Sequence, residues 1–224
     1  MKQYASVFNI LWKDMLSHFR SAETIISVPF FALITIVVFA FAFNTGGTGF
    51  AAEQTAAIIW ISFTFSGVIG LSQAFVNEKE NSCLKGLLLC PVERHIIFLG
   101  KLLVSFIVIS IMEAITTPVF LILFNVTCRI PDLIALIVLT TLGLSAVGTL
   151  FSVISSASRT REILFPILFF PIIVPLLITA ISATTSIFEG KLLGNMMPWI
   201  GGIIAFDVLF ITISLLIFEV MVEE

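Results

Sequence analysis

The sequence predicts an all-α integral membrane protein with six transmembrane helices and an amphipathic helix in front of them. Hydrophobic residues make up 59% of the chain, charged residues only 11%, and the mean hydropathy is +1.18. Soluble domains carry about a quarter charged residues, so this chain has too few polar side chains to cover a water-facing surface. The net charge of -3 provides no basic surface for a nucleic acid.

Six segments approach the ~20 apolar residues that a helix needs to cross a bilayer. They cover residues 25–43, 56–75, 103–124, 133–154, 163–183 and 199–220. Because lipid offers the backbone no hydrogen bonds, each segment is expected to be a helix. Together with the first 22 residues they predict a single transmembrane domain that spans residues 1–224.

The distribution of basic residues predicts that both chain termini lie in the cytoplasm, since cytoplasmic loops are enriched in Lys and Arg. In that orientation the outer segments hold only Arg129 and Lys191. The inner segments hold Lys2, Lys13, Arg20, Lys79, Lys85, Arg94, Lys101, Arg159 and Arg161. Trp60 and Trp199 fall near the outer ends of their spans, as in an aromatic belt.

Residues 1–22 alternate apolar and polar side chains with helical spacing. This pattern is typical of an amphipathic helix that lies in the headgroup region, with Trp12 as its anchor.

Two acidic residues lie inside predicted spans, Glu113 in the third and Asp207 in the sixth. An ionised side chain at such depth costs ~2.5–3.5 kcal/mol on insertion scales. Each acid therefore has either a functional or a structural role. It lines a polar substrate route or locks two helices together, or it makes a structural hydrogen bond as a neutral acid. The two acids could also pair, although nothing in the sequence brings their spans together.

Proline and small residues predict special geometry in two further spans. Pro166, Pro171 and Pro175 should bend or break the fifth span, and the stretch 184–198 that follows it could dip back into the outer leaflet. In the fourth span a strip of small residues should allow close helix contact. The strip consists of Gly143, Ser145, Gly148 and Ser152.

Residues 77–101 form the most charged segment between two spans. Asn77 and Glu80 have the spacing of a helix start, and Pro91 would end that helix. One face would carry Leu84, Leu87 and Leu88, and the other Glu78, Asn81 and Lys85. Such a helix either covers headgroups or receives a push from a partner protein.

The chain lacks the motifs of an ATPase or of the common enzymes. It has no G-x-x-x-x-G-K-[ST] phosphate loop, no H-E-x-x-H and no G-x-S-x-G. Its three cysteines, Cys83, Cys90 and Cys128, form no CxxC pair. We therefore expect a non-catalytic chain, with ATP bound by another subunit.

Four stretches of the chain resemble consecutive parts of the haem exporter protein B family (CcmB-like). They read KDMLSHFRSAETIISVPFFALITIVVFAFAF, EKENSCLKGLLLCPVERHIIFLGK, SRTREILFPILFFPIIVPLL and AFDVLF with FEVMVEE. The resemblance implies the ABC-2 type exporter fold, with an elbow helix at residues 1–22, six spans, and a re-entrant outer element before the last span. It also implies that residues 77–101 form the segment that couples the permease to a separate ATPase subunit. The residues expected to contact the ATPase are Glu78, Glu80, Asn81, Leu84, Lys85, Leu87 and Leu88.

The family likeness also implies partners and a location. The permease subunit would act in cytochrome c maturation, in the bacterial inner membrane, as a pair of copies with an A-type ATPase. A haem-handling C subunit and a small D subunit would attach, so this chain itself would bind neither haem nor ATP. Two alternatives are an ABC-2 exporter of another substrate (a lipid, a glycan or a small molecule) and a proton-coupled carrier that uses Glu113 and Asp207.

Overall fold

The computed structural model describes residues 22–43, 51–80, 94–156, 161–191, 194 and 196–221, and this part of the chain contains six helices and no strands. All six helices are long and apolar enough to cross a membrane. The predicted all-α membrane protein with six spans is therefore confirmed, whereas the amphipathic helix expected at residues 1–22 and the ABC-2 exporter fold stay predictions. The helices are α2 (Ala22–Phe43), α3 (Ala52–Glu80), α5 (Arg94–Leu123), α6 (Ile130–Ser156), α7 (Arg161–Phe188) and α8 (Met197–Met221).

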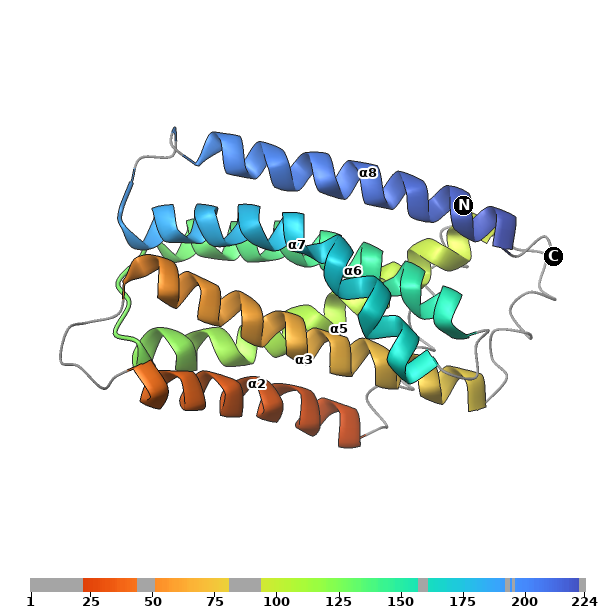
Figure 1. Ribbon diagram of the computed structural model, residues 1–224, viewed down its shortest axis with the longest axis horizontal. Coiled ribbons are helices and arrows are strands. Elements are labelled where there is room, and N and C mark those ends of the chain that lie inside the picture. The colour runs from red at the N-terminus through yellow and green to blue at the C-terminus, as the bar shows by residue number, and fades with distance from the viewer. Residues whose placement is uncertain are drawn as a thin grey trace.

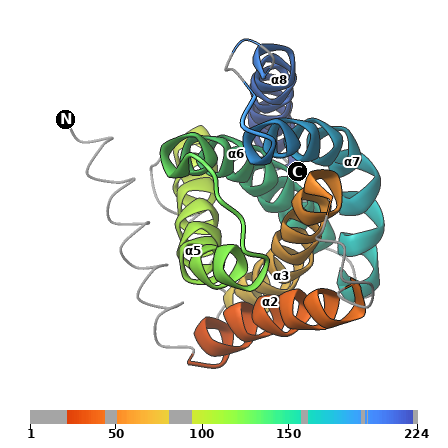
Figure 2. The same cartoon turned by 90° about the vertical axis from the view of Figure 1, so that its left-hand side faces the viewer.

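The helices α3 and α6 form the interior of the bundle. About 72% of the apolar window of each is buried inside the protein, against 22% for α2 and for α8. The view along the helices places α2 and α8 at opposite edges, with α3, α5, α6 and α7 between them (Figure 2). The outward faces of α2, α7 and α8 carry large apolar side chains that match lipid.

The helices α5 and α7 both end in a tight turn at the same end of the bundle (Figure 1). At the end of α5, Asn125 has a φ of 49°, and at the end of α7, Gly190 has a φ of 65°. In each turn an amide N–H returns to a carbonyl five residues earlier, Val126 to Leu121 at 3.1 Å and Lys191 to Ser186 at 3.0 Å. This left-handed cap ends both helices sharply.

All six helices begin before the predicted boundary, and the largest differences are at the end of α3, the start of α5 and the end of α7. The helix α3 continues through Asn77 to Glu80, so the predicted helix start at Asn77 is wrong. No Gly or Pro interrupts residues 71–80, and the spacing of a helix start also occurs inside helices. Similarly, α5 already begins at Arg94, inside the predicted loop.

The expectation that the chain leaves the helix after residue 183 is also wrong, because α7 continues to Phe188. Three hydroxyl groups there bond back to the carbonyl four residues earlier, those of Thr184, Thr185 and Ser186. This back-bonding satisfies the polar side chains without a loop. Pro166, Pro171 and Pro175 lie inside α7, which is one helix and changes direction near its middle (Figure 1).

Of the two tryptophans assigned to an aromatic belt, Trp60 is placed differently. Its side chain is only 1% exposed and lies in the core of the bundle, whereas Trp199 is 38% exposed. Trp12, the rest of residues 1–21 and the segment 81–93 lie outside the described residues, and so do Asn81, Leu84, Lys85, Leu87 and Leu88.

Candidate functional site

The two intramembrane acids lie inside the bundle, and both contact α6. Glu113 of α5 is 1% exposed, and a hydrogen bond of 2.6 Å joins its Oε2 to Oγ1 of Thr141. Asp207 of α8 is 4% exposed, and its Oδ1 occupies the place that a Cβ atom on Gly143 would take. Neither carboxyl group therefore faces lipid.

The acids do not bond to each other, because α6 lies between them. Thr141 and Gly143 are two residues apart on a helix with about 3.6 residues per turn, so they point to nearly opposite sides. Oε1 of Glu113 and both carboxyl oxygens of Asp207 have no hydrogen-bond partner. The pairing that the sequence left open is thus excluded in this conformation.

Glu113 belongs to a buried polar seam between α5 and α6. Two turns from the Glu113 contact, Thr149 Oγ1 lies 3.2 Å from Ser105 Oγ in the same antiparallel register. Lys101, one turn further along α5, is only 3% exposed. We call this set the α5–α6 seam: Lys101, Ser105, Glu113 and Thr116 of α5, and Thr141, Ser145, Thr149 and Ser152 of α6.

Toward the end of the bundle where α5 begins, the polar side chains of the seam lie among buried apolar ones such as Leu102 and Ala146, and toward the other end the seam is apolar. Beyond Thr116, the buried side chains are Phe120 of α5, Phe124 in the turn that follows α5, and Leu133, Leu136 and Ile137 of α6. The rings of Phe120 and Phe124 stack with their centroids 4.6 Å apart. A proton or water molecule that reaches Glu113 along the seam would therefore come from the end of the bundle where Arg94 lies.

Small residues on α6 permit these contacts, in agreement with the predicted strip. A Cβ on Gly143 would meet Asp207 and also Leu176 of α7 at 2.9 Å, and one on Gly148 would meet Leu71 of α3. Ser145 and Ser152 lie in the seam. Sequence reasoning missed Thr141, Thr149 and Ser105, although hydroxyl residues at positions 141, 145 and 149 repeat every four residues on one helix face.

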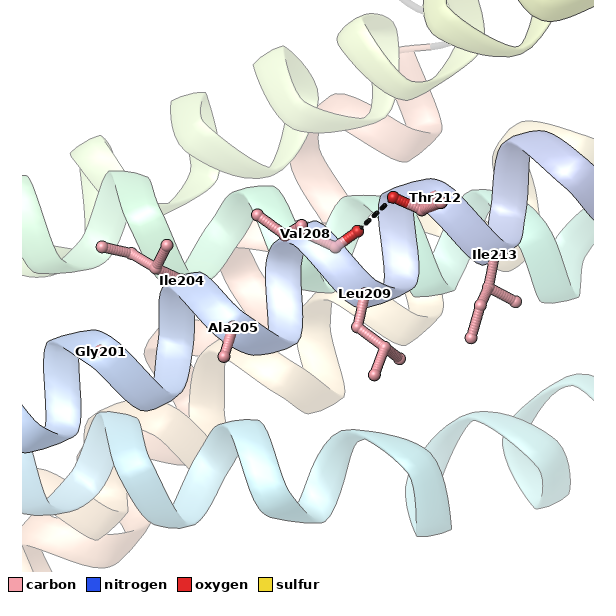
Figure 3. Close-up of a pocket in the computed structure, with 7 residues that line it drawn as sticks. All are labelled: Gly201, Ile204, Ala205, Val208, Leu209, Thr212 and Ile213. Carbon is pink, nitrogen blue, oxygen red and sulfur yellow. Dashed lines mark hydrogen bonds between the residues drawn. The ribbon is translucent and has the colours of Figure 1, made fainter.

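A shallow groove runs along the outer face of α8 (Figure 3). All of its lining residues come from α8 itself, namely Gly201, Ile204, Ala205, Val208, Leu209, Thr212 and Ile213. Its one hydroxyl group, on Thr212, donates a 2.7 Å bond to the carbonyl of Val208. The groove therefore offers an apolar surface and no charged group to a substrate.

The predicted ATPase-contacting residues are only partly visible. Glu78 and Glu80 lie in the last turn of α3, at the end of the bundle where α5 begins at Arg94. Between these helices, the other predicted contact residues lie outside the described part of the chain. Among the described residues, no group of three His, Cys, Asp or Glu side chains could hold a metal ion.

Comparison with known proteins gives one family. The family model described as CcmB protein matches residues 5–221, which is nearly the whole chain. A search of curated proteins finds none that matches.

Proposed function

This chain belongs to the CcmB protein family, the permease component of a haem exporter, and we propose that a separate ATPase subunit drives it in cytochrome c maturation. The observation that carries the proposal is the family match over residues 5–221. The six membrane-length helices agree with a multi-pass permease.

The segment proposed to receive the ATPase is joined directly to two long helices. This segment, residues 77–101, includes the end of the 29-residue α3 at Glu80 and the start of the 30-residue α5 at Arg94. Both helices pack against α6. A displacement of these two helix ends would therefore be transmitted to α6 at the centre of the bundle.

The proposed complex contains two copies of this chain, two A-type ATPase subunits, a haem-handling C subunit and a small D subunit. The fold would be of the ABC-2 exporter type, in the bacterial inner membrane with both termini in the cytoplasm. The permease itself would be non-catalytic and would leave haem to the C subunit and ATP to the A subunit.

Charge reversal at the end of α3 tests the coupling. We expect Glu78→Lys with Glu80→Lys to reduce both the amount of ATPase that co-purifies with the chain and the ATP hydrolysis of the complex. A matched control is Glu53→Lys, which makes the same change at the exposed first turn of the same helix. Normal ATPase binding and hydrolysis in the double variant would refute the docking assignment.

The same purification tests the haem pathway. We expect the wild-type chain, extracted gently, to bring with it an ATPase and a haem-binding membrane subunit. An ATPase without any haem-binding partner would instead indicate an exporter of another substrate.

A further inference from the structure

The contacts of Thr141 determine where one proton must lie. Its Oγ1 is 2.6 Å from Oε2 of Glu113 and 2.7 Å from the carbonyl oxygen of Ile137. A threonine hydroxyl has a single proton to donate, and a carbonyl oxygen can only accept. If both short contacts are hydrogen bonds, the second proton must be on the carboxyl group of Glu113.

The bond from Thr141 to Ile137 follows the usual pattern of hydroxyl groups in this protein. Thr116 donates to Met112 at 2.9 Å, Ser145 to Thr141 at 2.7 Å, and Thr184 to Ala180 at 2.8 Å. Each bond reaches the carbonyl four residues earlier, as is common for Ser and Thr in helices. If Thr141 follows this pattern and gives its proton to Ile137, its contact with Oε2 of Glu113 requires a proton on the carboxyl group.

The surroundings of Glu113 also favour the neutral form. Its Oε1 has no hydrogen-bond partner, and a buried carboxylate needs several. On α5 itself, Lys101 is ~18 Å and His95 ~27 Å from Glu113 along the helix, at 1.5 Å per residue. Asp207 lies across α6.

The helices that pack against α5 are α2, α3, α6 and α8. Their described titratable side chains are Glu53, Asp132 and Asp207, and α2 has none between Ile26 and Phe43.

Of these groups, Glu53 is exposed in the first turn of α3, and Asp132 pairs with Arg129 at 3.5 Å. Neither compensates a charge on Glu113. Loss of the proton would force Thr141 to turn its hydroxyl from Ile137 to the carboxylate, and would leave a negative oxygen without a partner in the core.

We propose that Glu113 is a proton-binding site that joins α5 to α6 as a neutral acid and releases this contact when it ionises. The proton leaves toward the end of the bundle where α5 begins, because the next buried hydroxyl groups of the seam, Ser105 and Thr149, lie in that direction. This inference is independent of ATPase coupling and would hold for a permease of any substrate.

Infrared spectroscopy of the full chain in lipid bilayers tests the protonation state directly. The spectrum should contain the C=O stretching band of a protonated carboxylic acid that is lost in Glu113→Gln. Recording both in an Asp207→Asn background removes the contribution of the other buried acid. Thr141→Val should shift the Glu113 band, whereas Thr141→Ser, which keeps the hydroxyl group, should not. Absence of the band at every pH at which the protein is folded would overturn the proposal, as would a band that Thr141→Val leaves in place.

Hydrogen exchange tests the second half of the proposal. Backbone amides of α5 and α6 in the wild-type chain should exchange faster at alkaline pH than the intrinsic pH dependence of exchange accounts for. Glu113→Gln should remove that excess, because an amide N–H donates to Thr141 at any pH. Thr141→Ser, which keeps the titrating carboxyl group, should retain the excess. An excess that is equal in wild type and Glu113→Gln would show that ionisation of Glu113 does not release the helices.

Discussion

The indole Nε1–H of Trp60 in α3 donates a 2.8 Å hydrogen bond to Oγ1 of Thr184 in α7, and both side chains are buried. These residues are 124 positions apart in the chain. The ring of Phe63 meets Trp60 edge-on at 5.8 Å. The pair therefore fixes the rotation of α3 against α7, and it explains why this tryptophan is in the core and not in the headgroup region.

Thr184→Val should destabilise the protein by about 1–3 kcal/mol, because it leaves the indole N–H buried without an acceptor. Thr184→Ser should cost less, since the hydroxyl group remains. The matched control is Thr185→Val, where the hydroxyl bonds only the backbone of its own helix. Thermal unfolding midpoints in one detergent would compare the variants, and equal midpoints for the two valine substitutions would contradict the role of the pair.

Gly143→Ala should destabilise the protein by about 1–3 kcal/mol, the usual cost of an added methyl group in a packed interior. The new Cβ would overlap Asp207 and press on Leu176. Gly67→Ala in α3 is the control, since its Cβ would meet nothing closer than 3.9 Å. Adding Asp207→Ala to Gly143→Ala should recover part of the lost stability. Additive effects of the two substitutions would show that they do not interact.

Gly190→Ala should cost about 1–2 kcal/mol, because an L-residue with a side chain is strained in the left-handed conformation that ends α7. Gly201→Ala should be neutral or slightly stabilising, since it lies on the exposed face of helical α8 with open space around it. Chemical unfolding of the two variants side by side measures the difference. A Gly190→Ala protein as stable as wild type would mean that the turn relaxes to another conformation.

Cys128 reports the orientation of the chain. It lies in the connection between α5 and α6, outside the membrane-spanning segments, and burial raises the pKa of its thiol. With Cys83 and Cys90 changed to Ser, an impermeant maleimide should label Cys128 from the periplasmic side only. Labelling should accelerate as the pH rises, because a raised pKa leaves little thiolate at neutral pH.

The control for the Cys128 experiment is Thr127→Cys in a chain without the other cysteines, because Thr127 is exposed in the same turn. It should react faster at neutral pH and from the same side. Labelling from the cytoplasmic side in both proteins would reverse the proposed orientation.

The number of helices could be predicted from the sequence, because a span needs a long apolar run that has no other explanation in a chain this poor in charge. The residues at which the helices end could not be predicted in this way. Hydropathy falls where charged residues begin, but α3 remains helical through Glu78 and Glu80 because nothing there breaks the helix. For the same reason α7 includes the polar Thr184 and Thr185.

The burial of Glu113 and Asp207 could be anticipated, because ionisable residues in spans rarely face lipid. The residues that the two carboxyl groups contact could not be anticipated. The contact of Glu113 with Thr141 and the position of Asp207 over Gly143 depend on how α5 and α8 each pack against α6. Spacing within one helix contains no information about that arrangement.

The tight turn at Asn125 gives α5 the geometry of a lever. The turn joins one end of α5 to α6 and can serve as the fulcrum, while the other end, Arg94, lies within residues 77–101, the segment proposed to receive the ATPase. Glu113 is ten residues from the last residue of the 30-residue helix, so it lies about a third of the way along the arm. If Arg94 were displaced by ~3 Å, Glu113 would move by ~1 Å, which is enough to take a 2.6 Å hydrogen bond beyond its range.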